Sequence, residues 1–318
     1  MSLIFNQLVG STNNLFSIED LMVFDDDTLH RMLVGSSFGL TPERLAHCFH
    51  NGPPSIVERV EQYLSPQQRS CFLREFRRPL PQNVVESACQ EILNTLFWEL
   101  TYWKTPELYD ELIAGEQLHP GIFLRLQPDI RGRTVLDVGA GSGRGSFECL
   151  RCGAKRVYAV EPSPGLLHLL ERKRIRLPHR DRVIPLAGRF DALPVAENSV
   201  DITLSCSAFT ALPEQGGEPG LAEMKRVTKP GGKVVVIWPR IEDRDWLAAH
   251  GFHYVALPLD RDMCIRFRSL ESALLCVQHF YAGNPAVVHY ILSTQQPEVP
   301  FSVLGVNPPH DYCWLEVS

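Results

Sequence analysis

The sequence lacks the features of a membrane-spanning protein and of a protein that coats nucleic acid. None of its apolar runs approaches the roughly 18 to 20 residues of a membrane span. Lys and Arg number 31 against 37 Asp and Glu, so there is no broad basic field to hold a polyanion. The N-terminus lacks the basic start and long apolar stretch of a secretory signal. We therefore expect a cytoplasmic protein with neither a membrane span nor a nucleic-acid partner.

Cysteines are present, but not in a pattern typical of disulfides or of metal sites. They number nine, which is odd, and are scattered along 318 residues. Cys149 and Cys152 form the one C-x-x-C, and no second pair or histidine cluster follows at the spacing of a zinc finger. A metal or redox role stays open for this pair, but we expect buried or incidental thiols and no metal site.

The composition is 44% hydrophobic, which is enough for a packed core, and the first part of the chain has a helical pattern. Apolar residues at three- and four-residue spacing predict helices at 18–34, 41–50, 54–64, 66–77 and 82–98. The expected N-caps are Ser17, Asp27, Thr41 and Ser65. Residues 1–98 are therefore predicted to form an all-α helical bundle, with no constellation of catalytic side chains.

From residue 131 onward, buried apolar runs alternate with helical stretches. The runs are TVLDV (134–138), RVYAV (156–160), VDITLS (200–205) and KVVVIW (233–238). This alternation is typical of a parallel sheet with helices on both faces. We expect an α/β domain with a Rossmann-like doubly wound sheet over 131–318, joined to the bundle by a linker or lid at 99–130. Tyr109 and His119, in that linker, could fold over a ligand or simply pack.

The stretch VLDVGAGSGRG at 135–145 is the most informative part of the sequence. A buried strand runs into a turn with glycines at 139, 141 and 143, which permit positive φ and close approach of a ligand. The helix that follows offers backbone N–H groups, and Glu161, at the end of the next strand, can accept hydrogen bonds from ribose hydroxyls. Asp137 suits a ligand with an ammonium group and would repel a pyrophosphate. A nicotinamide oxidoreductase is therefore the less favoured alternative.

This loop and its downstream pattern resemble the class I S-adenosylmethionine-dependent methyltransferases, in the broad group of small-molecule enzymes that includes the quinone C-methylases. The resemblance covers about residues 131–240 and rests on VLDVGAGSGRG, VEPSPGLL, FDALPVAENSVDITLSCSAF and EMKRVTKPGGKVVVIWP. It implies a methyltransferase with S-adenosylmethionine as its cofactor.

Carried over position by position, the resemblance implies a set of cofactor contacts. The contacts around the methionine part would be Asp137, Gly139, Ala140, Gly141 and Gly143, and Ser142 of the same loop is also assigned to cofactor binding. Glu161 would hold the ribose, and the residues near the adenine would be Pro162, Ser163, Phe190 and Asp191. The residues facing the methyl group and the acceptor would be Ser205, Cys206 and Ser207. Arg189 departs from the family, which has an acidic residue there, so Asp191 or backbone groups would have to contact the adenine amine.

The resemblance leaves the acceptor and any catalytic residue unidentified. The cofactor carries a reactive methyl group, so a general base is needed only if the nucleophile must lose a proton. Ser205-Cys206-Ser207-Ala208-Phe209 does not match an Asn-Pro-Pro-Tyr amide motif, which weakens a DNA-amine or glutamine acceptor. We expect a small-molecule acceptor. The alternatives are a protein methyltransferase that docks its target through residues 1–98, and a non-catalytic scaffold or sensor that binds the cofactor.

The first part of the chain has a resemblance of its own. The stretches IEDLMVFDDDTLHRML, LTPERLAHCFHNGPPSIVERVEQYLSPQQRSCFLREF and VVESACQEIL are similar to the helical modules of FliG, the flagellar motor switch protein. In that family, such armadillo-like bundles bind other proteins. The resemblance implies an interaction domain and a protein partner for residues 1–98, and the alternative is a lineage-specific helical extension.

The end of the chain is predicted to interrupt the family's terminal hairpin with an insertion of roughly 50 residues. A short helix is expected at 242–250, a strand at 252–258, an amphipathic helix at 269–282 and the last strand at 311–317. Insertions of this kind shape substrate pockets, so we expect acceptor specificity to reside here and in residues 99–130.

Overall fold

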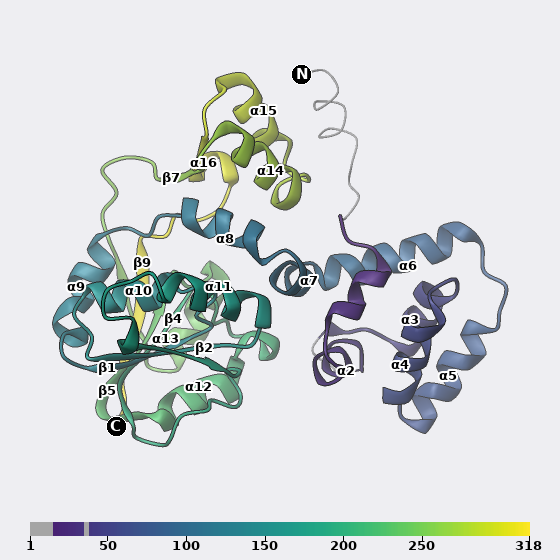
Figure 1. Cartoon of the computed structure of the whole chain (residues 1–318), viewed down its shortest axis with the longest axis horizontal. Coiled ribbons are helices and arrows are strands. Elements are labelled where there is room, and N and C mark those ends of the chain that lie inside the picture. Colours follow the sequence, from purple (N-terminus) through teal and green to yellow (C-terminus); the bar gives the residue numbers. More distant parts are fainter. Residues whose placement is uncertain (1–14, 35–37) are drawn as a thin grey trace. The chain divides into compact units, whose positions relative to one another are not determined.

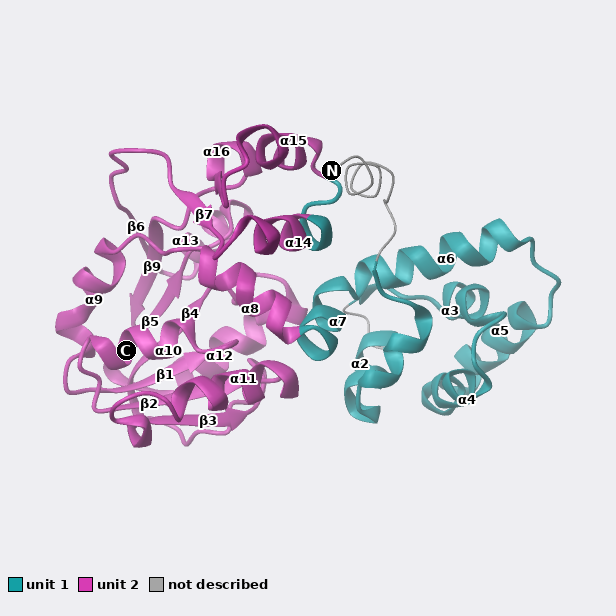
Figure 2. Cartoon of the chain, turned by 45° about the horizontal axis from the view of Figure 1, so that its top comes forward, with its two compact units in different colours: residues 1–105, 278–283 teal, residues 106–277, 284–318 magenta. Residues whose placement is uncertain are grey.

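The computed structural model describes residues 15–34 and 38–318, and these form two compact units (Figures 1 and 2). Unit 1 comprises the described residues up to Thr105 together with Gln278–Gly283. Unit 2 comprises Pro106–Val277 and Asn284–Ser318. No helix in the described ranges combines the length and apolar character needed to cross a bilayer.

Unit 1 is built from short helices whose starts are marked in the sequence. Its elements are η1 (Ile18–Val23), α2 (Asp26–Val34), α3 (Pro42–Phe49), α4 (Pro54–Tyr63), α5 (Pro66–Phe76), α6 (Gln82–Thr95) and α7 (Phe97–Lys104). Proline occupies the first helical position of α3, α4 and α5, where its missing N–H costs no hydrogen bond. Thr41 and Ser65 act as the predicted caps, since their hydroxyls accept from Arg44 N and Gln68 N, each at 3.3 Å.

Two of the predicted helices are interrupted in the structure. The helix expected at 18–34 is η1 followed by α2, and the one expected at 82–98 ends at Thr95, before α7 begins. The cap of α2 is Asp25, whose Oδ1 accepts from Thr28 N at 2.8 Å. Asp27, the predicted cap, lies in the first turn of α2. In a run of three aspartates, only the one whose carboxylate reaches the N–H three residues ahead can cap the helix.

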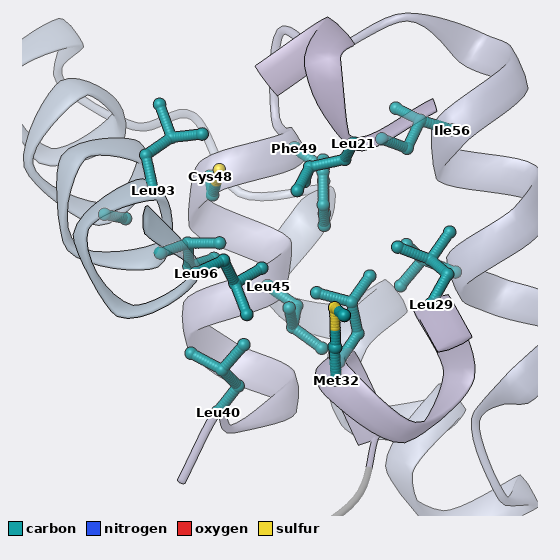
Figure 3. Close-up of a cluster of buried hydrophobic side chains, with 14 of the residues drawn as sticks. Leu21, Leu29, Met32, Leu40, Leu45, Cys48, Phe49, Ile56, Leu93 and Leu96 are labelled. Atoms are coloured by element: carbon teal, nitrogen blue, oxygen red, sulfur yellow. The ribbon is translucent and has the colours of Figure 1, made fainter. Parts of the chain in front are cut away.

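The core of unit 1 is apolar and draws on most of its helices. Figure 3 shows side chains of η1, α2, α3, α4 and α6 meeting in one cluster. Leu45, Phe49, Ile56 and Leu96 are all completely buried. Burial of each such side chain is worth about 1.5–3 kcal/mol, so this cluster is the main support of the bundle.

A segment from late in the chain completes unit 1. His279, near the end of α14 (Leu270–Phe280), lies 5.5 Å from the ring of Phe16 and 5.1 Å from that of Phe97, measured between centroids. Its Nε2 is 3.3 Å from Thr101 Oγ1. Burial lowers the pKa of His279 to about 4, so the ring packs as a neutral aromatic group.

Unit 2 is built on a seven-stranded sheet in the order β3-β2-β1-β4-β5-β9-β6. Its strands are β1 (Thr134–Val138), β2 (Arg156–Glu161), β3 (Val183–Ala187), β4 (Val200–Cys206), β5 (Thr228–Ile237), β6 (His253–Ala256) and β9 (Asp311–Glu316). β1 to β5 pair in parallel, and β9 is antiparallel to both β5 and β6. The strands predicted from the four apolar runs are confirmed, although β5 starts earlier than expected.

Both faces of the sheet are covered. Alternate residues of β1 point to opposite faces, so Val135 packs with α9 (Gly121–Ile130) and α10 (Arg144–Arg151). Leu136 packs with α12 (Gly217–Val227) and α13 (Arg244–Ala249). α11 (Pro164–Arg174) connects β2 to β3. The predicted Rossmann-like doubly wound fold is therefore confirmed.

The remaining elements precede the sheet or interrupt its last hairpin (Figure 1). α8 (Pro106–Gly115) precedes α9, and between β6 and β9 lie β7 (Cys264–Arg266), α14, α15 (Pro285–Thr294), β8 (Glu298–Pro300) and α16 (Phe301–Leu304). β7 and β8 pair as a separate two-stranded sheet. α8 ends against it, since Glu116 bridges to Ile265 of β7.

Candidate functional site

Strand order brings the glycine-rich loop and Ser205–Ser207 to one point on the sheet edge. β1 and β4 are parallel neighbours, with Asp137 opposite Leu204. The chain order reverses between them, because β2 lies on the other side of β1. A switch point of this kind opens a crevice beyond the carboxyl ends of the strands, which is where open α/β sheets bind ligands.

The glycine-rich loop after β1 requires glycine for both conformation and space. Gly139, Gly141 and Gly143 have φ of 70°, 56° and 102°, which few other residues adopt. Gly139 N and Ala140 N donate to Val160 O at 2.9 and 3.0 Å, which joins the loop to the end of β2. A Cβ on Gly139 would lie 2.6 Å from Ala208 Cβ, closer than two carbons can approach.

Asp137 is a completely buried carboxylate beside this loop. Its Oδ2 accepts from Ser146 Oγ at 2.6 Å, and its Oδ1 has no hydrogen-bond partner among the described residues. Burial raises the pKa of Asp137 to about 6, although Ser146 opposes the shift. A buried acceptor without a donor costs free energy, and a ligand with a positively charged donor would satisfy it.

Glu161 lies at the end of β2 and is held there by the backbone. Its Oε2 accepts from Gly141 N at 2.8 Å, and its Oε1 accepts from Ser163 N at 2.9 Å. These bonds tie the carboxylate to the loop and to the start of α11, where Ser163 Oγ caps Leu166 N at 3.4 Å. Carboxylate oxygens can accept more than one hydrogen bond each, as a pair of ribose hydroxyls would require. Pro162 is exposed between these two buried neighbours.

The loop after β3 packs close to the glycine-rich loop. The ring of Phe190 lies edge-on to Phe209 at 5.6 Å, and its Cζ would be 3.2 Å from a Cβ on Gly139. Asp191 forms an ion pair with Arg189. The residue that departs from the family pattern is thus the partner of the carboxylate expected near the adenine, and the adenine contact itself stays a prediction.

The end of β4 carries two further polar groups. Ser205 Oγ is buried with no hydrogen-bond partner in the described part of the chain. Ser207 has a φ of 61°, an unfavourable conformation for serine, and its Oγ accepts from Arg144 at 2.8 Å. Cys206 lies between these two serines. Burial raises the pKa of its thiol, and the nearby Arg144 opposes this shift. The three predicted residues therefore lie together at the crevice.

Sequence reasoning missed several charged residues beside the loop. Ser142 Oγ donates to Asp110 Oδ1 at 2.5 Å, and Lys173 pairs with the same carboxylate. Arg144 directly follows Gly143, the last glycine of the loop. This position is the one feature of the sequence that could have indicated a role for Arg144 in the site. Tyr109, named from sequence as a candidate lid residue, has its Cε1 3.9 Å from where a Cβ on Gly141 would be.

A cavity of about 790 Å³ opens beside the loop. Its walls come from α8, α9, α10 and the turn that contains His119, the second candidate lid residue. This volume is within the roughly 300–1,000 Å³ of small-molecule sites. Cys152 of the C-x-x-C lines it, with its thiol 3.6 Å from Phe123 O, whereas Cys149 is fully buried.

At the other end of the chain, His310 Nδ1 is bonded to Leu257 O at 2.7 Å, just before β9.

Comparison with known proteins finds similarity over the region that contains the crevice. Residues 135–232 match the model of a family described as a methyltransferase domain. An uncharacterized methyltransferase of Mycobacteroides abscessus is 35% identical over 159 residues, 48% of this chain and 56% of that protein. A demethylmenaquinone methyltransferase of Renibacterium salmoninarum is 42% identical over 108 residues, 34% of this chain and 41% of that protein.

These alignments span only about half of each relative. Among solved structures, a SAM dependent methyltransferase from Aquifex aeolicus is 23% identical, with a TM-score of 0.38 over 44% of this chain and 82% of that one.

Proposed function

We propose that residues 135–232, which match the model of a methyltransferase domain, form a class I S-adenosylmethionine-dependent methyltransferase domain, and that the whole protein is a methyltransferase acting on a small organic acceptor. The proposed cofactor is S-adenosylmethionine, which would supply a methyl group on a positively charged sulfur. The protein then has to bind, align and exclude water.

The observation that carries the proposal is the unsatisfied carboxylate at the crevice. Asp137 Oδ1 is buried without a donor, next to a loop whose glycines leave room for a ligand. The α-ammonium group of S-adenosylmethionine is a donor of the right charge for it. We propose that Asp137 and the loop residues 139–143 hold the methionine part and that Glu161 holds the ribose.

The other predicted contacts complete the proposed cofactor site. Pro162, Ser163, Phe190 and Asp191 border the adenine, with Asp191 held by Arg189. Ser205, Cys206 and Ser207 face the methyl group. Ser205 Oγ, like Asp137 Oδ1, is a buried polar atom with no partner in the described residues, and it lies at this end of the site, as expected of a residue that meets a ligand.

Two observations support a small acceptor. The cavity beside the loop has the volume of a small-molecule site. The relative from Renibacterium salmoninarum is named for demethylmenaquinone, a small molecule. The bundle of residues 1–98 is proposed to bind a protein partner, on the strength of its resemblance to protein-binding helical modules.

Calorimetric titration with S-adenosylmethionine and S-adenosylhomocysteine tests the cofactor site. We expect micromolar binding to the wild type and at least tenfold weaker binding to Asp137→Asn and Glu161→Gln, because each loses a charge-assisted hydrogen bond. Asp129→Asn is the matched control, since this carboxylate of α9 pairs with Lys233 of β5 and is not among the proposed cofactor contacts. Absence of binding to the wild type would overturn the proposal.

A further inference from the structure

The cavity beside the glycine-rich loop has aromatic and aliphatic side chains among its charged ones, and one buried ion pair. Phe123 of α9 and Phe147 of α10 provide aromatic walls, and Ile113 and Leu118 add aliphatic surface from α8 and the turn after it. Ser142 and Arg144 belong to the same lining, so the cavity reaches the proposed cofactor site. A molecule in this cavity would therefore have its polar end near the crevice and its apolar part between the helices.

Arg144 and Glu116 form the buried ion pair. An Arg144 guanidinium nitrogen lies 3.5 Å from Glu116 Oε2 and donates to Glu116 O at 3.0 Å. Their side chains are only 16% and 10% exposed. The other guanidinium terminus donates to Ser207 Oγ, which places the pair at the end of β4.

The charges that line the cavity cancel. Arg144, Arg151 and Lys173 are opposed by Asp110, Glu116 and Glu148. Each base pairs with one acid: Arg144 with Glu116, Lys173 with Asp110, and Arg151 with Glu148. The side chain of Arg151 is 70% exposed and that of Lys173 39%, so these two pairs are closer to water. A cavity of zero net charge favours the entry of an uncharged molecule.

We infer that this cavity binds the methyl acceptor, that the acceptor is an apolar or aromatic molecule with a weakly acidic hydroxyl (a phenol or an enol), and that Glu116 removes its proton while Arg144 binds the resulting oxyanion. This inference rests on the proposed function and names the acceptor class for the same site. It also makes Glu116 the general base that sequence analysis could not identify.

The proton transfer leaves the cavity without a change in net charge. The acceptor's O–H bond breaks, its electron pair stays on oxygen, and the proton goes to a carboxylate oxygen of Glu116. Arg144 then exchanges one anionic partner, Glu116, for another, the acceptor oxygen. Burial raises the pKa of Glu116, although Arg144 opposes the shift, so the neutral form is less unfavourable here than it would be in water.

Spectroscopy with a model acceptor tests the pair directly. The probe is 2-naphthol, whose anion absorbs at longer wavelength than the neutral molecule. The comparison ligand is 2-methoxynaphthalene, which has no acidic proton. Both are titrated into the full-length protein saturated with S-adenosylhomocysteine. The variants are Glu116→Gln, Arg144→Met and Arg144→Lys, and the matched control is Glu148→Gln, which changes a more exposed carboxylate of the same cavity.

We expect the wild type to bind 2-naphthol at least tenfold more tightly than 2-methoxynaphthalene and to show the absorption of the anion. Glu116→Gln and Arg144→Met should lose this absorption and about tenfold in affinity. Arg144→Lys should keep part of both, and Glu148→Gln should behave as the wild type. If Arg144→Met fails to fold, Glu116→Gln and Arg144→Lys carry the test.

Three outcomes would overturn the inference: no binding of 2-naphthol to the wild type, equal affinity for the two naphthalenes, or undiminished anion absorption in Glu116→Gln. S-adenosylhomocysteine titrations of the same samples separate the two proposals. Absence of S-adenosylhomocysteine binding to the wild type would contradict the proposed function itself. Normal cofactor binding together with any of the three outcomes would contradict only the assignment of the acceptor and its base.

Discussion

At the scale of single residues, the burial of Asp137 makes folding sensitive to pH. Its pKa of about 6 in the folded chain lies above the ordinary 3.8, so the folded state holds this proton more tightly than the unfolded state does. The contribution of Asp137 to the free energy of unfolding should therefore fall as pH rises from about 4 to about 6, by on the order of 3 kcal/mol. Urea unfolding across this range, compared with Asp137→Asn, measures it, and parallel pH profiles for the two proteins would contradict it.

Binding of the cofactor product should show the opposite dependence on pH. An ammonium group is bound best by ionised Asp137, so the affinity for S-adenosylhomocysteine should rise as pH increases through about 6. Calorimetric titrations at a series of pH values test this, with Asp137→Asn as the variant in which the rise disappears. A rise of the same size in that variant would assign the effect to another group.

A comparison of Gly139 with Gly132 distinguishes two reasons for a glycine: a positive φ and the lack of room for a Cβ. Gly139 and Gly132 both have positive φ, 70° and 72°, but a Cβ on Gly139 would clash with Ala208, whereas a Cβ on Gly132 would meet nothing within 4 Å. Gly132→Ala should cost about 1 kcal/mol of unfolding free energy through strain alone. Gly139→Ala should cost more and abolish S-adenosylhomocysteine binding. Urea unfolding and calorimetry measure both effects, and equal losses of stability would show that the clash is relieved cheaply.

At the scale of elements, the caps that the sequence predicted can be tested one helix at a time. Ser65 begins α5 with a reciprocal pair of bonds, because Ser65 N also donates to Gln68 Oε1 at 3.0 Å. Ser65→Ala should lower the free energy of unfolding of unit 1 by about 1 kcal/mol. Ser65→Asp keeps an acceptor at the cap and should retain most of the stability. A loss in Ser65→Asp as large as that in Ser65→Ala would argue against the cap.

The elements that could be predicted are those set by local pattern. β1 matches its predicted bounds because its apolar run is followed by Gly139, whose positive φ ends the strand and begins the turn. β5 starts at Thr228, five residues before the predicted Lys233, because Thr228 pairs with Val200 across an irregular stretch of the sheet. This pairing is a tertiary contact, so no local pattern in the sequence indicates it.

The candidate site divides in the same way. The loop, Glu161 and the end of β4 were predicted because they follow strands, and the strand order alone brings them together. Glu116, the residue after α8, and Arg144, the first residue of α10, are 28 residues apart in sequence and come into contact only in the folded chain. A glutamate after one helix and an arginine at the start of another form no distinguishing pattern in the sequence. Their pairing can therefore be identified only from the folded structure.

At the scale of the whole molecule, the two units should respond to different perturbations. Phe49 is fully buried in unit 1, and Phe301 is 1% exposed in unit 2. Each change to alanine should cost about 3–5 kcal/mol, but in its own unit. S-adenosylhomocysteine at about 100 times its Kd should add about 2.7 kcal/mol to unit 2.

Thermal unfolding followed by calorimetry distinguishes these effects. The ligand should raise one transition, which Phe301→Ala lowers, and Phe49→Ala should lower the other while leaving the affinity for S-adenosylhomocysteine unchanged. A single transition that shifts in all three experiments would show that the units unfold together.

The return of the chain to unit 1 at Gln278–Gly283 has a consequence for biosynthesis. A ribosome makes the helices of unit 1 first, but the segment that carries His279 emerges only after most of unit 2. Until then, Phe16 and Phe97 lack the ring that packs against them in the finished protein. The aromatic surface of the nascent bundle therefore stays uncovered while unit 2 is translated. During this interval we expect the bundle to be most accessible to chaperones and most prone to aggregation.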